Sequence, residues 1–220
     1  QSEVFVTATY QGSYDDAITK LKAGLQSKDV PAVTQMYDLG LRLLIDLKVV
    51  KPVQDFIDRD KFDVSDVEPA VRNYYSVGGK LYPMPFNSSN PVLYYNKTMF
   101  KEAGLDPEKA PRTFAEVTEA ARKLVKKDST GKVVQYGCSF AIYGWFVEQF
   151  IAVQGGYYVN NENGRKALAT EATFNGPEGV KLLEWWKSLN DEGICVNLGR
   201  KTADTKKAFD SGVVAMTLDS

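Results

Sequence analysis

The sequence contains no histidine in its 220 residues. Histidine is the commonest general base near neutral pH and the commonest metal ligand in proteins. Its absence excludes a nucleophilic triad of the Ser-His kind and a histidine-based zinc site within this chain. We expect neither a cofactor nor a bound metal.

Cysteine is almost as scarce, since the chain has only Cys138 and Cys195. So low a count is compatible with one disulfide and equally with two buried thiols. Two small buried hydrophobic side chains are the simpler interpretation, but the sequence leaves the pairing open.

The chain also lacks a charge of one sign and long apolar runs. Its formal net charge is −1, without the basic face that a nucleic-acid-binding domain needs, so no nucleic-acid partner is expected. No apolar run approaches the length of a transmembrane helix, and the opening Gln-Ser-Glu-Val-Phe-Val lacks the regions of a signal peptide. We expect these residues to belong to a mature, soluble part.

What the first part of the chain does contain is strand-like and helix-like stretches in alternation. Residues 3–9 and 30–34 are rich in β-branched residues and predict two strands. A helix is predicted after each strand from apolar residues that share one face, namely Ala17, Ile18, Leu21 and Leu25, then Leu39, Leu43, Leu44 and Leu47. This order is typical of a parallel α/β sheet.

The most informative stretch is residues 84–107, Met-Pro-Phe-Asn-Ser-Ser-Asn-Pro-Val-Leu-Tyr-Tyr-Asn-Lys-Thr-Met-Phe-Lys-Glu-Ala-Gly-Leu-Asp-Pro. Its polar Asn-Ser-Ser leads into an apolar strand at residues 92–95, followed by a short helix that ends at Gly104. The capping box Thr113-Phe-Ala-Glu116 then opens a second helix. This pattern indicates a segment that passes between two lobes.

Beyond this crossing the alternation starts afresh. Helices are predicted at residues 113–127, 145–153 and 202–210, and another from Pro177 to just before Gly193. Strands are predicted at residues 133–140 and 213–218. Trp185 and Trp186 lie at helical spacing with Leu182, Leu183 and Leu189, so packing is the expected role of both.

Residues 84–107 and the motif after them resemble the inter-lobe crossing of family-1 extracellular solute-binding proteins of ABC importers, most closely the glycerol-3-phosphate-binding members. The resemblance implies an α/β fold with a two-lobe, periplasmic-binding-protein-like (type II) architecture and an incomplete first lobe, so the chain resembles a fragment. It implies that residues 1–86 form part of lobe one, residues 87–92 the crossing, residues 93–214 lobe two, and residues 215–220 the start of a return crossing.

The resemblance also points to ligand-binding residues in the first part. In the glycerol-phosphate binders the tyrosine of a Gly-x-Tyr turn, an acidic residue one strand later and a serine at the crossing contact the ligand. These positions match Tyr14, Asp38 and Ser89, with Ser88 as the neighbouring candidate. The acidic position is often glutamate in the family, so Asp38 has a shorter reach. The plainer alternatives are packing for Tyr14, a favourable helix-dipole interaction for Asp38, and satisfaction of backbone groups for the serines.

Two further residues come from the second part. Trp145, in Tyr-Gly-Trp-Phe, resembles the lobe-two tryptophan that lines the family's cleft, and its plainer alternative is a core aromatic. Ser220 reaches the position of a serine at the return crossing, although Leu-Asp-Ser departs from the hydroxyl-rich sequence expected there. Aromatic rings and polar groups together suit a ligand that has both hydroxyls and C–H faces.

The resemblance implies capture without catalysis. Two lobes close like a hinge over a glycerol phosphate, a glycerophosphodiester or a sugar and deliver it to ABC permease subunits. We expect a monomer that is periplasmic or extracellular, with free and lipid-anchored forms both open. The main alternative is a glycoside hydrolase, which needs two carboxylates at a defined separation, and no motif places Glu148 beside Asp38. A protein-interaction domain without a solute is the third hypothesis.

Overall fold

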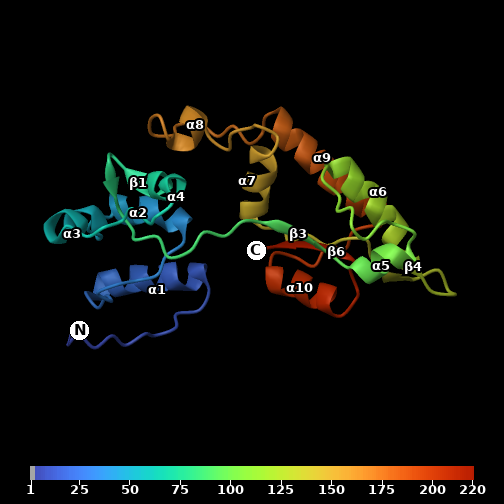
Figure 1. The fold of residues 1–220 in the computed structure, drawn as a ribbon, viewed down its shortest axis with the longest axis horizontal. Helices are drawn as coiled ribbons and strands as arrows, with labels where there is room; N and C mark the ends of the chain where they lie inside the picture. Colours follow the sequence, from blue (N-terminus) through green and yellow to red (C-terminus); the bar gives the residue numbers. More distant parts are fainter. Residues whose placement is uncertain (1–2) are drawn as a thin grey trace. The chain divides into compact units, whose positions relative to one another are not determined.

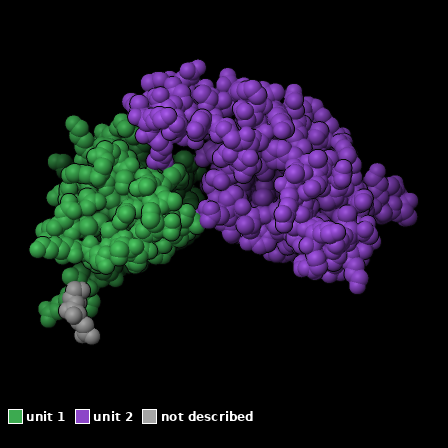
Figure 2. Space-filling model, turned by 45° about the horizontal axis from the view of Figure 1, so that its top comes forward, with its two compact units in different colours: residues 1–88 green, residues 89–220 purple. Residues whose placement is uncertain are grey.

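The computed structural model describes residues 3–220, so the first two residues of the range predicted for lobe one lie outside it. The chain divides into two compact parts (Figure 2), unit 1 up to Ser88 and unit 2 from Ser89 to Ser220. Each unit has its own helices and strands (Figure 1).

Unit 1 is mostly helical. Its elements are α1 (Tyr14–Ser27), the short 3-10 helix η1 (Asp38–Gly40), α2 (Leu41–Asp46), α3 (Val53–Asp60), α4 (Pro69–Tyr74), β1 (Ser76–Val77) and β2 (Lys80–Leu81). The two strands form an antiparallel hairpin. Its turn is Gly78-Gly79, where both residues have positive φ, a conformation that glycine adopts without a steric penalty.

Both helices predicted in this part are confirmed. Helix α1 begins after Ser13, whose hydroxyl accepts a hydrogen bond from the backbone N–H of Asp16 while the Asp16 carboxylate accepts one from the backbone of Ser13. This reciprocal capping satisfies two N–H groups that would otherwise lack partners. The second predicted helix corresponds to η1 followed by α2.

The two strands predicted in this part are wrong. Residues 3–9 and residues 30–34 have no regular secondary structure, and the side chains of Val4 and Phe5 are 73% and 98% exposed. A strand is stabilised by hydrogen bonds to a neighbouring strand, and within residues 3–220 neither segment has such a partner. The parallel sheet expected for the first lobe is therefore not formed by the described residues.

Unit 2 mixes helices and strands. Its elements are β3 (Val92–Tyr95), α5 (Lys97–Glu102), α6 (Phe114–Leu124), β4 (Lys126–Lys127), β5 (Val133–Gln135), α7 (Gly144–Ala152), α8 (Asn160–Gly164), α9 (Pro177–Asp191), α10 (Thr202–Asp210) and β6 (Met216–Asp219). The predicted helices and the strand at residues 92–95 are confirmed, except that the helix predicted to residue 127 ends at Leu124, and residues 126–127 form β4. The Thr113 hydroxyl caps α6, whereas the Glu116 carboxylate accepts its hydrogen bond from the backbone of Arg112. Only half of the predicted capping box therefore forms.

The strands of unit 2 bring distant segments together. Strands β3 and β6 are antiparallel, with Val92 opposite Asp219. Beyond β5 the chain continues as single parallel bridges, Cys138 with Cys195 and Ser139 with Thr217. The strand predicted at residues 133–140 is thus a short strand followed by isolated pairings. Helix α10 lies against β6 (Figure 1).

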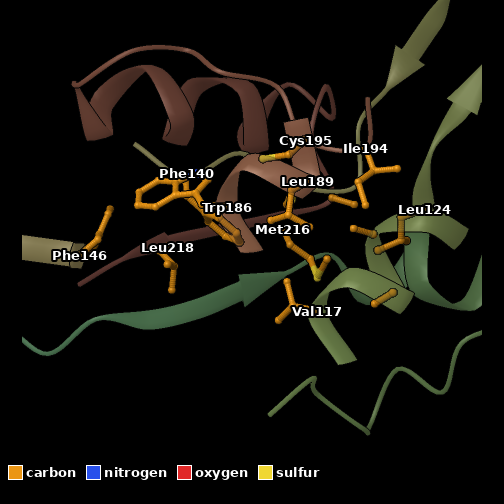
Figure 3. Packing of buried hydrophobic residues seen from close by; sticks show 14 of the residues in the cluster. Val117, Leu124, Phe140, Phe146, Trp186, Leu189, Ile194, Cys195, Met216 and Leu218 are labelled. Carbon is orange, nitrogen blue, oxygen red and sulfur yellow. The ribbon is translucent and has the colours of Figure 1, made fainter. Parts of the chain in front are cut away.

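The hydrophobic core described here belongs to unit 2 (Figure 3). Phe146, Leu182, Leu189 and Met216 are at most 1% exposed and pack in this cluster with Trp186. The packing role predicted for the two neighbouring tryptophans is confirmed, because Trp186 is buried and the Trp185 indole N–H donates to the Phe114 carbonyl and the Thr118 hydroxyl.

Both cysteines lie in this core. Cys138 and Cys195 are buried free thiols on paired backbone segments. The simpler of the two interpretations, small buried hydrophobic side chains, describes them in this structure.

Candidate functional site

Tyr14 is the first residue of α1, directly after the capping Ser13. The cap fixes where the helix begins and so fixes the direction of the Tyr14 side chain. Its ring is 45% exposed and stacks on the ring of Tyr37, with centroids 5.0 Å apart and planes 2° from parallel. One of the predicted ligand contacts thus presents an accessible aromatic face.

Asp38 begins η1, and its carboxylate is half-buried. The Tyr74 hydroxyl, from the end of α4, donates a hydrogen bond to Asp38 Oδ2 over 2.6 Å. The neighbouring Tyr37 hydroxyl donates to Asp15 Oδ1 over 3.1 Å. These contacts connect three segments of unit 1, namely the start of α1, η1 and the end of α4.

A fourth tyrosine joins this group. Burial raises the pKa of Tyr75, and the nearby charge of Asp38 and the Tyr14 side chain raise it further. The ring of Tyr75 also meets that of Tyr74 edge-on, with centroids 5.1 Å apart. We call Tyr14, Tyr37, Asp38, Tyr74 and Tyr75 the tyrosine–aspartate cluster.

The tyrosine–aspartate cluster brings together two of the predicted site residues, Tyr14 and Asp38. Tyrosine rings offer flat apolar faces on which the C–H groups of a polyol or sugar can pack. A carboxylate accepts hydrogen bonds from hydroxyl groups. The cluster therefore combines the two kinds of group that a small hydroxylated ligand needs.

The register of β3 and β6 places Ser89 and Ser220 at the same end of this strand pair in unit 2. Ser89 precedes β3 by three positions, Ser220 directly follows β6, and the two strands are antiparallel with Val92 opposite Asp219. Both serines are exposed and lie at the same end of this strand pair. Ser88, also exposed, is the last residue of unit 1.

A charged pair lies beside Ser220. The Ser220 backbone N–H donates to Asp219 Oδ1 over 2.8 Å, and Lys206 Nζ on α10 lies 3.0 Å from Asp219 Oδ2. Asp219 is buried, so this ion pair compensates a carboxylate that has lost most of its contact with water.

Trp145 is the second residue of α7, directly after the loop that leads into this helix. The parallel bridge between Ser139 and Thr217 means that this loop leaves the sheet at the same edge as Ser220, because the carboxyl ends of parallel strands share an edge. The Trp145 ring is half-buried and contacts the rings of Phe146, at 5.5 Å, and Tyr143, at 6.5 Å. It packs partly on the core and keeps part of its surface accessible.

Two surface hollows of unit 2 lie elsewhere. One, of about 270 Å³, is lined largely by apolar residues, including Phe140, Leu183 and Trp186. The other, of about 550 Å³, is lined by residues that include the ion pair of Arg122 and Glu192. Within residues 3–220, none of the six predicted site residues lines either hollow.

Across residues 3–220 no helix combines the length and the apolar character needed to cross a membrane. In this described part of the chain, no three or more cysteine or acidic side chains group where they would hold a metal ion.

Reasoning from the sequence missed Tyr37, Tyr74 and Tyr75. Tyr37 was adjacent to a predicted site residue, which is a signal that could have found it. The hydrogen bond from Tyr74 joins residues 36 positions apart, and no local pattern predicts such a contact.

The comparisons with known proteins agree with one another. The family model described as bacterial extracellular solute-binding protein matches residues 1–220. The sn-glycerol-3-phosphate-binding periplasmic protein UgpB of Escherichia coli K12 is 36% identical over 220 residues, covering 98% of this chain and 49% of the relative. The chain therefore spans about half the length of the curated relatives that it matches.

Solved structures show the same fold. The ABC substrate-binding protein Lmo0181 from Listeria monocytogenes, solved in complex with cycloalternan, superposes with a TM-score of 0.76 at 26% identity, covering 94% of this chain and 51% of that chain. UgpB from Mycobacterium tuberculosis, solved with glycerophosphocholine, superposes with a TM-score of 0.77 at 21% identity. The match covers 94% of this chain and 49% of that chain. The predicted α/β, type II binding-protein architecture with an incomplete first lobe is confirmed.

Proposed function

The chain belongs to the bacterial extracellular solute-binding proteins, and on that premise we propose that the protein captures a small polyol phosphate or sugar and delivers it unchanged to an ABC import permease. The observation that carries this proposal is the 36% identity to an sn-glycerol-3-phosphate-binding protein along 98% of the chain. The tyrosine–aspartate cluster supports it, because its groups suit a hydroxylated ligand.

The first candidate solute is sn-glycerol 3-phosphate or one of its esters. The name of the Escherichia coli relative favours it. An oligosaccharide is the second candidate, since Lmo0181 was solved in complex with cycloalternan. Both candidates carry hydroxyl groups for a carboxylate and C–H groups for aromatic rings.

The proposed ligand-binding residues come from both units. Tyr14 and Asp38 act from unit 1, where Tyr14 supplies a ring face and Asp38 accepts hydrogen bonds from solute hydroxyls. In unit 2, Trp145 supplies a second ring and Ser220 a hydroxyl group. Ser88 and Ser89, on either side of the boundary between the units, supply the remaining hydroxyl contacts.

Capture follows from a change of population. A solute that contacts both units binds the closed form better than the open form, so its binding energy shifts the protein toward closure. The permease then recognises the closed, loaded form, as in other two-lobe binding proteins that close by a hinge. No bond of the solute is made or broken.

The proposed setting is outside the cytoplasmic membrane. The family is extracellular, and the Escherichia coli relative is named as periplasmic. We place the protein there as a monomer that docks on two permease subunits, either free or held at the membrane surface by a lipid anchor. A cytoplasmic ATPase would act through the permease.

The hydrolase alternative gains no support. The proteins to which this chain is similar are named as binding proteins. A glycoside hydrolase needs a protonated acid and a second carboxylate on opposite sides of one bond. The interactions of Asp38 with Tyr74 and Tyr75 instead make it a hydrogen-bonding group in a ring-lined cluster.

The proposal is tested by isothermal titration calorimetry of the intact protein with sn-glycerol 3-phosphate, glycerophosphocholine and maltose. We expect saturable one-to-one binding of at least one of them and recovery of the same compound, unaltered, by mass spectrometry. Release of glucose from maltose would instead establish the hydrolase. Absence of binding to every compound in the panel would contradict the proposed solute class.

A further inference from the structure

We infer that Tyr74 is a positioning residue, which holds the Asp38 carboxylate so that its second oxygen accepts a hydroxyl of the solute. This inference rests on the proposed function and deepens it. It starts from the 2.6 Å hydrogen bond that the Tyr74 hydroxyl donates to Asp38 Oδ2. A hydroxyl-to-carboxylate bond of this length is charge-assisted and stronger than one between neutral groups.

The geometry of Asp38 explains why positioning matters. A carboxylate has two oxygens that together accept about four hydrogen bonds. Because Tyr74 binds Oδ2, rotation of the carboxylate about its last side-chain bond is restricted, and Oδ1 keeps its lone pairs for another donor. Asp38 is also one methylene shorter than glutamate, so a poorly oriented carboxylate would reach less far than a fixed one.

Tyr74 is itself held in place. It is the last residue of α4, a helix that begins with Pro69, and its ring meets that of Tyr75 edge-on. Tyr75 in turn lies near enough to Asp38 and Tyr14 for both to raise its pKa. The Tyr74 side chain is therefore restrained before the solute binds. Less conformational entropy is then lost on binding.

The fixed Asp38 carboxylate also orients the solute. A fixed carboxylate attracts hydroxyl donors and repels a phosphate, since two negative groups disfavour each other at short range. The Tyr14–Tyr37 stack beside it offers ring faces for C–H groups. Unit 1 therefore receives the polyol end of a polyol phosphate, and the phosphate is directed away from Asp38.

The test is calorimetry of the intact protein with sn-glycerol 3-phosphate and with propane-1,2-diol 1-phosphate, which lacks one hydroxyl group. The variants are Tyr74→Phe, Asp38→Asn and the double variant. Tyr74→Phe removes only the hydroxyl of a side chain that is 45% exposed, so the fold is retained, and thermal unfolding verifies this. Tyr10→Phe is the matched control, because Tyr10 lies in unit 1 and is 88% exposed.

The expected result is that Tyr74→Phe weakens binding of sn-glycerol 3-phosphate roughly tenfold, about the effect of one hydrogen bond to a charged group. The double variant should bind no more weakly than Asp38→Asn alone, because Tyr74 acts through Asp38. Preference for sn-glycerol 3-phosphate over propane-1,2-diol 1-phosphate should also fall in Tyr74→Phe and stay unchanged in Tyr10→Phe.

Two outcomes would overturn the inference while leaving the proposed function intact. One is Tyr74→Phe binding as tightly as the wild type. The other is additive losses in the double variant, which would mean that Tyr74 acts independently of Asp38. If the wild type binds none of the polyol phosphates or sugars, the proposed function fails first, and the inference fails with it.

Discussion

Tyr74 and Asp38 are joined by a hydrogen bond of 2.6 Å although 36 positions separate them in the chain. The bond connects the end of α4 to the start of η1, and a stack of Tyr14 and Tyr37 lies in the same cluster. A helix start, a 3-10 turn and a helix end thereby place rings and a carboxylate at one location in unit 1.

Replacing Asp38 by Asn should weaken solute binding without unfolding the protein. The substitution keeps the size of the side chain but removes the charge that strengthens its hydrogen bonds, each worth about 1.5–3 kcal/mol, so affinity should fall roughly 10- to 100-fold. Calorimetry measures the affinity and circular dichroism the melting temperature. Asp46→Asn is the control, since Asp46 forms an exposed ion pair with Arg42. Equal affinities for the Asp38→Asn and Asp46→Asn variants would show that Asp38 does not bind the solute.

Replacing Trp145 by Phe should abolish most of the fluorescence change that the solute causes. Trp145 is half-buried and proposed to contact the solute, whereas Trp185 stacks on Phe114 at 4.3 Å with its indole N–H bonded inside unit 2. The matched variant Trp185→Phe should therefore keep the response. If the signal instead disappears in Trp185→Phe and persists in Trp145→Phe, the reporter is a core residue and Trp145 is a packing residue.

Replacing Ser13 by Ala should destabilise α1. The Ser13 hydroxyl caps the helix that positions Tyr14, and loss of such a cap costs about 1 kcal/mol of unfolding free energy. Urea denaturation followed by circular dichroism measures the loss. Ser129→Ala, in an exposed turn of unit 2, should leave the midpoint unchanged.

The reciprocal cap of Ser13 and Asp16 predicts that the stability of the protein depends on pH. The hydrogen bonds from Ser13 lower the pKa of the Asp16 carboxyl below its ordinary 3.8. A group whose pKa is lowered by folding stabilises the fold above its unfolded pKa and loses that effect as the pH falls. The stability advantage of the wild type over Ser13→Ala should accordingly shrink as the pH is lowered below about 3.8. An advantage that stays constant to pH 2 would contradict the reciprocal cap.

From the buried thiol of Cys138 we predict that the stability of the fold also depends on pH in the alkaline range. A hydrogen bond with Cys195, and then burial, raise the pKa of Cys138 well above its ordinary 9.0. Above pH 9.0 the thiol ionises in the unfolded chain before it does so in the folded one, so the folded state loses stability as the pH rises. Urea unfolding between pH 7 and pH 10.5 should show this loss in the wild type and a smaller one in Cys138→Ala. Identical pH profiles for the two proteins would contradict it.

The helices were largely predictable because their signals are local. Ser13, Thr113 and Pro177 mark helix starts, and the periodic apolar residues between start and end form one face. Such signals need only neighbouring residues, so α1, α6 and α9 follow from the sequence. The resemblance in residues 84–107 likewise identified the family from a continuous motif.

The strands and the tyrosine–aspartate cluster show which features could not be predicted from the sequence alone. Residues 3–9 have the composition of a strand, but a strand requires a partner, and the described residues supply none. Tyr14 and Asp38 were identified by family resemblance. Tyr74 and Tyr75 were not, because their contacts with these residues depend on how α4 packs in three dimensions.

A crystal structure of the intact protein, bound to whichever compound of the calorimetry panel binds most tightly, would show which residues hold the solute. We predict one unaltered solute molecule with a hydroxyl within hydrogen-bonding distance of Asp38 Oδ1, the Tyr74 bond to Oδ2 retained, and the Trp145 ring against the same molecule. A solute bound elsewhere, in contact with neither Asp38 nor Trp145, would contradict it.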